Sequence, residues 1–473
     1  MTLTRSADAL GVGAAKLVVS LAVLAAGFRA VSDDDYARVV IAQRFAEAPH
    51  LDPSGTSWLP LPFWIYGGVF SVLGGSLSVA RGVAIALGMG SMALLLLAAR
   101  WLGIGRFGSL AGVLVAALFP WSAWLAAAPV PEVPAAALSV LGMAALSREG
   151  PRERALGAAA LAAACFCRYE AWPVAIAFAA VTLYDAARSP RRNALVGAAA
   201  LALLPIGAWL LHGVFIHGDA TFFWKRVAAY KNALGEGPSL RERFFSVPTA
   251  LLTNEPELCL ALVLLGVDRS LLRRFARPAL AAGALLAFLM AGEISGGGPT
   301  HHAGRAVLSV WYLIALAIGG AIELRSAVPA ARPLAWLGFA LSLVGLGWVF
   351  RAGTPPAFAD RRDAVTIGTR ARELGAPALW IDTPDYSYLA VTAAYGRPNA
   401  AEPFDDRDPR HPRTADPFSS EITLRERASA RRDAWLVVSS PHLAVARQLG
   451  TVRAETPTLT LVAPAPRALA SDP

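Results

Sequence analysis

The sequence predicts an all-α polytopic membrane protein followed by a small C-terminal α/β domain. Hydrophobic residues make up 55% of the 473 positions and charged residues only 16%, a composition that a water-soluble globule does not have. The apolar residues fall into about eleven runs, each close to the length of a membrane-spanning helix. After residue 352 the composition changes to Pro, Arg and Asp. We therefore expect a transmembrane domain over residues 1–351 and an extracytoplasmic α/β domain over residues 352–473.

The apolar runs give the expected spans in order. The first run follows Arg5 and Lys16 as in a signal peptide, but more spans come after it, so we expect an uncleaved first helix. The runs lie near residues 11–31, 82–99, 107–128, 131–147, 155–170, 172–187, 194–216, 247–267, 278–292, 306–323 and 333–351.

The arginines determine which loops share a side of the membrane, because short cytoplasmic loops collect Lys and Arg. If the segment Trp58–Leu73 does not cross, fourteen arginines lie on the side of the N-terminus. They are Arg100, Arg106, Arg148, Arg152, Arg154, Arg188, Arg191, Arg192, Arg269, Arg273, Arg274, Arg277, Arg325 and Arg332. Trp58–Leu73, which contains Pro60 and Pro62, is then a helix in the outer interface or one that re-enters from it. We expect a multi-pass protein of the plasma (inner) membrane with residues 352–473 outside.

An acidic triplet, Asp33-Asp34-Asp35, follows the first apolar run. Three carboxylates are too costly for a position that faces lipid, so they must face water or a protein cavity. They are either a solvated helix stop or a functional site. Apolar residues recur at helical spacing after the triplet, which predicts an amphipathic surface helix with the carboxylates at its positive N-terminal end. There, one carboxylate could act as a general base.

A second acid comes from another outer loop. Glu132 is flanked by Pro131 and Pro134 at the expected start of a helix. Two carboxylates from separate loops allow one to act as base while the other orients the acceptor or holds a cation.

The order of these features resembles the opening of GT-C membrane glycosyltransferases. A first helix, an acidic pair, Ile41-Ala42, a Pro60-Leu61-Pro62 aromatic stretch, a Gly-Gly turn and Ala80-Arg81 follow one another. Within that class the chain resembles the glycosyltransferase 39 group, which includes protein mannosyltransferases and aminoarabinose transferases. The resemblance covers residues 10–190. It implies a GT-C fold and transfer of a sugar, with inversion, from a polyprenyl-phosphate donor to a lipid, glycan or protein acceptor on the outer face.

The resemblance also implies roles for single residues. Aligned through Ile41-Ala42, Asp34 takes the base position, Asp35 completes the acidic pair and Asp33 is an extra neighbour, while Glu132 takes the place of the second acid. The usual Pro-Pro-Leu is Pro60-Leu61-Pro62 here, and the later lipid-phosphate residues of the family do not align. No cofactor is required, and a divalent cation is compatible with these acids.

The phosphate of such a donor requires cations near the outer interface. The candidate substrate-binding residues are Asp33, Arg168, Glu170, Lys225, Arg226, His301, His302 and Arg305. Several of them could instead have structural roles. Arg168 and Glu170 could simply pair to close a helix hairpin, Lys225 and Arg226 could snorkel at the interface, and the two histidines could form a polar loop or hold a metal.

The alternative function is a transporter or flippase of the cell envelope, whose charges would line a path near the bilayer midplane. The expected spans are nearly free of ionisable residues, which favours the transferase. The arginine excess is explained by topology and compositional bias, so no nucleic-acid partner is expected.

The C-terminal region alternates short apolar runs with Arg-rich stretches, as in an α/β domain. We expect strands over Ala378–Ile381, Tyr388–Tyr395, Ala434–Ser439 and Thr458–Val462, and helices over Arg361–Leu374 and Leu424–Arg432.

Overall fold

A computed structural model of the protein describes residues 3–235, 239–296, 303–347, 360–411, 433–439 and 442–464. The chain forms two compact units. The helical unit comprises residues 1–28, 54–62 and 82–356, and the sheet unit comprises residues 29–53, 63–81 and 357–473. Segments of the expected first outer loop therefore fold together with the C-terminal domain.

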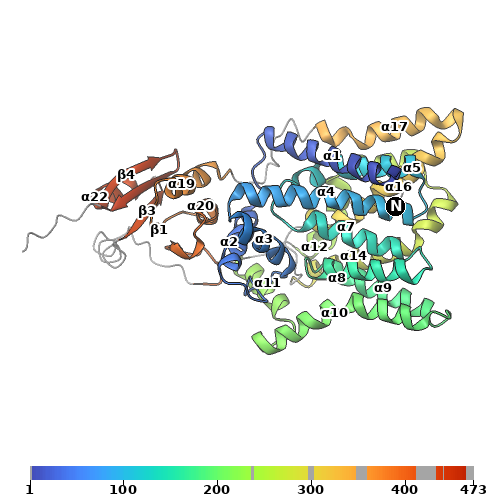
Figure 1. Ribbon diagram of the computed structural model, residues 1–473, viewed down its shortest axis with the longest axis horizontal. Coiled ribbons are helices and arrows are strands. Elements are labelled where there is room, and N and C mark those ends of the chain that lie inside the picture. The colour runs from blue at the N-terminus through green and yellow to red at the C-terminus, as the bar shows by residue number, and fades with distance from the viewer. Residues whose placement is uncertain are drawn as a thin grey trace, which may run out of the picture. The chain divides into compact units, whose positions relative to one another are not determined.

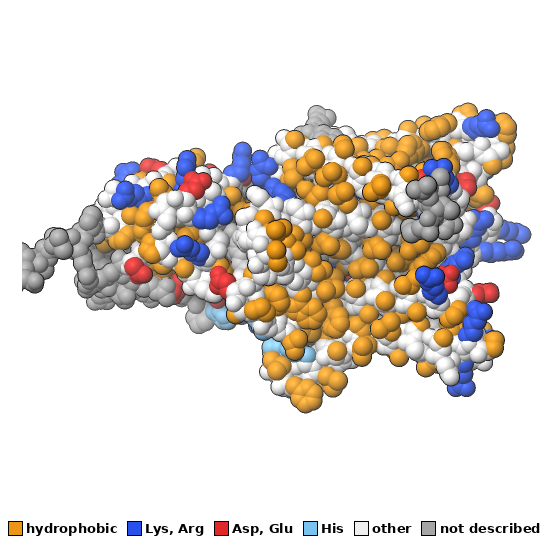
Figure 2. Space-filling view, in the orientation of Figure 1, with side chains coloured by type: hydrophobic (Ala, Val, Ile, Leu, Met, Phe, Trp, Pro, Cys, Tyr) orange, Lys and Arg blue, Asp and Glu red, His pale blue; other side chains and the backbone are white. Residues whose placement is uncertain are grey.

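The helical unit is a bundle of apolar helices that run side by side (Figure 1). Among the described residues, six helices are long and apolar enough to cross a membrane, and a bent pair would make a seventh span. Figure 2 shows hydrophobic side chains covering much of the visible surface of this bundle. The bounds of the helices in this part of the chain are α1 (Leu3–Ala25), α4 (Leu77–Trp101), α5 (Arg106–Leu118), α6 (Pro120–Leu125), α7 (Glu132–Ala145), α8 (Pro151–Cys165), α9 (Ala171–Ala186), α10 (Arg192–His217), α11 (Phe222–Ala233), α12 (Leu240–Thr253), α13 (Pro256–Leu265), α14 (Arg269–Ile294), α15 (Ala303–Ala306), α16 (Leu308–Ser326) and α17 (Arg332–Ser342).

Two of the expected spans are broken helices. The run 107–128 divides into α5 and α6 at Phe119-Pro120, and the run 247–267 divides into α12 and α13, which meet at an angle of 66°. Pro120 and Pro256 each stand at the first position of the second helix, where proline is tolerated because its missing N–H needs no partner. The segment Trp58–Leu73 contains one short helix, α3 (Leu61–Leu73).

The predicted arginine-rich loops contact one another. The Arg274 guanidinium donates to the carbonyl of Gly103, and Arg277 donates to the carbonyl of Leu146 and pairs with Asp185 at 2.8 Å. The loops after α4, α7, α9 and before α14 thus gather at one end of the bundle, where Lys and Arg side chains cluster in Figure 2. The topology prediction requires this shared end.

Lys16 corrects one detail of the sequence analysis. We expected it to precede the first apolar helix, but α1 begins at Leu3, so Lys16 lies within the helix and its side chain is fully buried. Its ammonium donates to the carbonyls of Ala117 (2.9 Å) and Ser122 (2.8 Å). Carbonyls of α5 and α6 thus bind a cation that lies within α1 and not in its flank.

The sheet unit contains a five-stranded sheet in the order β2-β1-β3-β5-β4. Strand β1 pairs in parallel with β2 and β3, and β5 pairs antiparallel with β3 and β4. The strands are β1 (Ala378–Ile381), β2 (Ala401–Pro403), β3 (Ala434–Ser439), β4 (Gly450–Glu455) and β5 (Leu459–Pro464). The predicted strands at β1 and β3 are confirmed, β5 begins one residue later than expected, and β2 and β4 were not foreseen. The expected helix Leu424–Arg432 lies outside the described residues.

One predicted strand is wrong. Tyr388–Tyr395 forms helix α20 (Ser387–Tyr395), which ends at Gly396 in the left-handed conformation, with φ 78°. Nearly all of its side chains are buried, so the segment has no polar face and its apolar pattern does not separate helix from strand. Helix α20 packs against α19 (Arg362–Glu373), the helix that we predicted, and against α2 (Asp33–Glu47).

Candidate functional site

Four of the predicted site residues meet in one cluster of the helical unit. The carboxylate oxygen Oε1 of Glu132 accepts hydrogen bonds from Arg168 Nη1 at 2.8 Å and from Arg305 Nη2 at 2.5 Å. Arg168 also pairs with Glu170, its Nη2 atom lying 2.5 Å from Oε1. We refer to these four residues as the Glu132 cluster.

The local sequence explains how the Glu132 cluster is positioned. Glu132 occupies the first turn of α7, where a carboxylate is stabilised by the positive end of the helix. Arg168 and Glu170 form the tight connection between α8 and α9, and Arg305 lies in the single turn of α15 that precedes α16. Since α7 leads to the arginine-rich loops at its other end, the cluster occupies the opposite end of the bundle.

The Glu132 cluster is buried and balanced in charge, with two guanidiniums and two carboxylates. The side chain of Glu132 is 1% exposed and that of Arg305 is 4% exposed, whereas Arg168 is 17% exposed. A cavity of about 20 Å³ lies beside these side chains, lined also by Ser139 and Ser309. It has room for about one water molecule. Both carboxylates already face guanidiniums, so the geometry favours an anion at Arg168 over a metal at Glu132.

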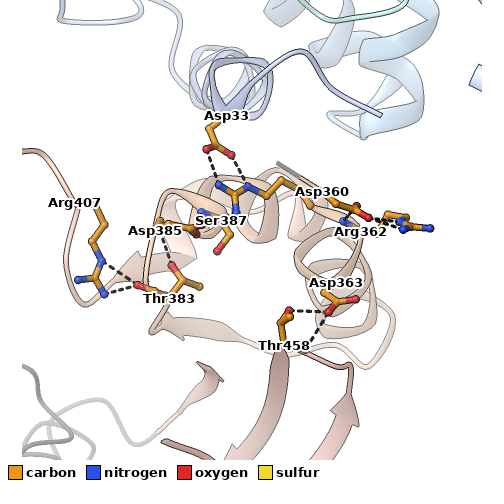
Figure 3. A network of polar contacts seen from close by, with 10 residues as sticks. Asp33, Asp360, Arg362, Asp363, Thr383, Asp385, Ser387, Arg407 and Thr458 are labelled. Atoms are coloured by element: carbon orange, nitrogen blue, oxygen red, sulfur yellow. Dashed lines mark hydrogen bonds and ion pairs between the residues drawn. The ribbon is translucent and has the colours of Figure 1, made fainter. Parts of the chain in front are cut away.

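The acidic triplet forms the first turn of α2, as predicted. Asp33 makes a two-point ion pair with Arg361, with Nε–Oδ1 at 2.7 Å and Nη2–Oδ2 at 2.8 Å. Arg361 also donates to Asp385 at 2.6 Å, so one guanidinium joins α2 to the loop after β1 (Figure 3). Asp33 therefore has a structural partner that the sequence did not reveal.

The charges of this network reinforce one another. Burial alone would lower the pKa of Arg361, but its hydrogen bonds to Asp33 and Asp385 outweigh burial and raise it. Burial alone would raise the pKa of Asp385, yet hydrogen bonds from Ser387 and Arg361 lower it. Arg361 and Asp385 are thus both charged at neutral pH.

The other two members of the triplet differ in exposure. Asp35 is 1% exposed, and its Oδ2 atom accepts a hydrogen bond from the backbone N–H of Val31 at 2.8 Å, which fixes the turn that enters α2. Asp34 is half-buried. Asp33 and Asp34 are both partly exposed, whereas Asp35 is buried. The assignment of Asp34 as the base stays a prediction.

The remaining candidates are Lys225, Arg226 and the two histidines. Lys225 is 72% exposed on α11 and pairs with Asp219 at 2.6 Å, and Arg226 is exposed on the same helix. The hydrogen bonds from Lys225 and Thr221 lower the pKa of Asp219 to about 2. His301 and His302 lie outside the described residues.

The sequence analysis did not predict that Arg361 binds Asp33 or that Lys16 binds the backbone of Ser122. Arg361 is separated from Asp33 by 328 residues and Lys16 from Ser122 by 106, so no local pattern connects them. A charged residue within an apolar run was the available signal for Lys16, because such residues are rarely placed against lipid.

Comparison with solved structures identifies the fold. No protein-family model matches the sequence, and no curated protein matches it. Solved structures do: the chain has the fold of aminoarabinose transferase, a GT-C membrane glycosyltransferase.

The particular structures are those of ArnT from Cupriavidus metallidurans. The structure bound to undecaprenyl phosphate is similar with a TM-score of 0.62 at 15% identity, covering 98% of this chain and 98% of that one. The apo structure is similar with a TM-score of 0.61 at 13% identity, covering 96% of this chain and 97% of that one. The GT-C fold expected from the resemblance is therefore confirmed over nearly the whole chain.

Proposed function

We propose that this protein transfers a sugar from a polyprenyl-phosphate donor to an acceptor on the outer face of the plasma membrane, with inversion at the sugar. The observation that carries the proposal is the ArnT-like fold over 98% of both chains, one of the ArnT structures being bound to undecaprenyl phosphate. The fold alone does not define an activity. The arrangement of charged side chains supplies the chemical argument.

Asp34 is the proposed general base. It lies half-buried in the first turn of α2, between Asp33, which is bound to Arg361, and Asp35, which is bound to the backbone of Val31. In the reaction, its carboxylate takes the proton of an acceptor hydroxyl as that oxygen bonds to the anomeric carbon. The bond from that carbon to the phosphate oxygen breaks, and polyprenyl phosphate leaves with the electron pair.

Arg168 and Arg305 are the proposed cations for the donor phosphate. Glu132 pairs with both guanidiniums. Without this carboxylate, burying two like charges next to each other would cost considerable free energy. Arg168, the more exposed of the two, now binds the carboxylate of Glu170 through Nε and Nη2. A phosphate offers oxygens that suit the same planar fork, so it would displace Glu170 from Arg168.

The test is sugar transfer by purified protein in liposomes, with a panel of radiolabelled polyprenyl-phosphate sugars and an extract of envelope acceptors. We expect label to pass to an acceptor with wild-type protein and with Asp433→Asn, which neutralises an exposed carboxylate of the sheet unit. We expect no transfer with Asp34→Asn.

The same liposomes separate the proposal from the alternative. A flippase would move labelled lipid between leaflets without forming product, and Asp34→Asn would leave that movement unchanged. Lipid movement without transfer for every donor in the panel would refute the transferase.

A further inference from the structure

Two acidic residues of the helical unit lie at the bend between α12 and α13. Glu255 directly precedes Pro256, which begins α13, and Glu257 lies in the first turn of that helix. Glu255 is fully buried and Glu257 is 8% exposed. Their carboxyl groups are within hydrogen-bonding distance of each other. We refer to the two residues as the Glu255–Glu257 pair.

The oxygens of this pair are incompletely bonded. Glu255 Oε1 accepts the backbone N–H of Trp121 at 2.8 Å. Glu255 Oε2 and Glu257 Oε1 are buried and accept no hydrogen bond from any residue that the structure describes. Ionised carboxylates only accept hydrogen bonds, so two of them in contact cannot bond to each other, and their charges repel. A bound proton or a metal cation would supply what these oxygens lack.

The packing around Glu257 favours the proton. A Cβ atom at Gly345 would overlap Glu257 Oε1 and would lie 2.9 Å from Cδ of Pro120, so backbone and proline atoms crowd that oxygen. Metal cations such as Mg²⁺ and Ca²⁺ require several oxygen ligands around them. A proton needs only an oxygen of each carboxyl group.

One proton also balances the buried charges at this place. Lys16 binds both sides of the break between α5 and α6, since its ammonium donates to the carbonyls of Ala117 and Ser122 and, at 3.0 Å, to Ser122 Oγ. Ser122 follows Trp121, so the ammonium and the Glu255–Glu257 pair bind consecutive residues of α6. One ammonium and two carboxylates would leave a net negative charge buried in the bundle, whereas one proton on the pair makes the set neutral.

Three other titratable side chains on α13 and on the elements packed against α12 and α13 leave this balance unchanged. Tyr312 on α16 is hydrogen-bonded to Ser122 Oγ and adds no positive charge. The Cys259 thiol on α13 is close enough to Glu257 for their charges to interact, but a thiol is never cationic. Arg305 on α15 is paired with Glu132 at 2.5 Å.

We propose that the Glu255–Glu257 pair binds one proton, which the two carboxyl groups share, and that this proton stabilises the bend between α12 and α13. The protonated carboxyl donates its O–H to the other carboxylate. Two groups that would repel each other thus form one charge-assisted hydrogen bond that carries a single negative charge. The pair shares no residue with the acidic triplet or with the Glu132 cluster. Its test is therefore independent of the sugar transfer proposed above.

The experiment measures thermal unfolding of the full-length protein in detergent from about pH 6 to about pH 9. Over this range the unfolded chain has released the proton and the folded protein still holds it, so stability falls as the pH rises. In Glu257→Gln the amide N–H donates to Glu255 in place of the shared proton. We expect a similar unfolding midpoint for this variant at the lower pH. The wild-type midpoint should then fall by roughly 3–5 °C more per pH unit than that of the variant.

The control is Glu293→Gln, which removes a carboxylate of α14 that is 21% exposed and paired with Lys231. This substitution leaves the bend unchanged, so the variant should keep the pH dependence of the wild type. Glu255→Gln should behave as Glu257→Gln does, because its amide can accept the Trp121 N–H through oxygen and donate to Glu257 through nitrogen.

A second measurement detects the proton directly. Infrared spectra at neutral pH, in H₂O and D₂O, should show the C=O band of a protonated carboxyl group in the wild type and in Glu293→Gln. This band should be lost or weakened in Glu255→Gln and in Glu257→Gln. Equal pH dependence in the wild type and Glu257→Gln, or an unchanged carboxyl band in both pair variants, would overturn the proposal. If EDTA destabilised the wild type and both pair variants were destabilised and insensitive to EDTA, a metal ion would occupy the site and the proton would be refuted.

Discussion

The buried ion pairs of the Glu132 cluster predict how the stability of the protein changes when one charge, or a pair of opposite charges, is removed. Glu132→Gln leaves two guanidiniums, Arg168 and Arg305, with the single carboxylate of Glu170. Glu132 is 1% exposed and accepts two charge-assisted hydrogen bonds from these arginines. Breaking such a buried pair from one side costs about 3–5 kcal/mol, because an uncompensated charge stays buried.

The second substitution should restore part of that loss. Glu132→Gln/Arg305→Gln leaves one guanidinium and one carboxylate, and these already contact each other at 2.5 Å. We therefore expect the double variant to be more stable than Glu132→Gln alone, with a coupling energy of about 2–3 kcal/mol. For a domain of this size, about 2–4 °C in the midpoint of thermal unfolding corresponds to each kcal/mol.

The assay heats detergent-solubilised protein and measures the fraction that still elutes as a single species. The matched control is the pair Lys231 and Glu293, which are 3.4 Å apart with side chains about one-fifth exposed. Their double substitution to Gln should show a coupling energy below about 1 kcal/mol. If the destabilisation by Glu132→Gln and by Arg305→Gln adds up in the double variant, the two residues do not form the buried pair described here.

Three further predictions follow from the same structure. Asp34→Asn should slow sugar transfer by about 10²–10⁴ while the protein stays folded, and transfer at the wild-type rate would exclude Asp34 as the base. Arg361→Gln should speed limited proteolysis of the sheet unit more than Asp33→Asn does, because it removes the ion pairs with both Asp33 (2.7 Å) and Asp385 (2.6 Å) whereas Asp33→Asn removes only the first, and equal effects would contradict this. In a background without native cysteines, Thr451→Cys should react with an impermeant thiol reagent in intact cells and Glu149→Cys should not. Both positions are exposed, and the reverse result would refute the topology.

The apolar segments and their grouping could be predicted because the membrane interior permits few backbone structures. A span must satisfy its own backbone, so long apolar runs become helices, and arginine-rich loops must share a side. The contacts of Arg274 with Gly103 and of Arg277 with Asp185 show those loops at one end of the bundle. The exact number of spans stays a prediction, since shorter helices such as α7 and α9 lie below the usual length.

Members of the candidate site could be predicted only where a charged residue stands out within its own short segment of the sequence. Glu132 and Arg168 stand at loop positions next to prolines or helix ends, and the structure brings them together with Arg305. The partner of Asp33 could not be predicted, because Arg361 is separated from it by 328 residues. Long-range pairing has no local signature.

The break between α5 and α6 explains two of the ionisable groups that the helical unit buries, Lys16 and Glu255. In a continuous helix the carbonyl of Ala117 would accept the N–H of Trp121. Here that N–H donates instead to Glu255 at 2.8 Å, and the Ala117 carbonyl accepts from Lys16 at 2.9 Å. An acid and a base from distant segments thus satisfy the two groups that the break separates, where an unsatisfied group would cost several kcal/mol in an apolar medium. Lys16 and Glu255 are the kind of buried ionisable groups that a transport path requires, but their hydrogen bonds stabilise a broken helix. This weakens the transporter alternative further than the sequence could.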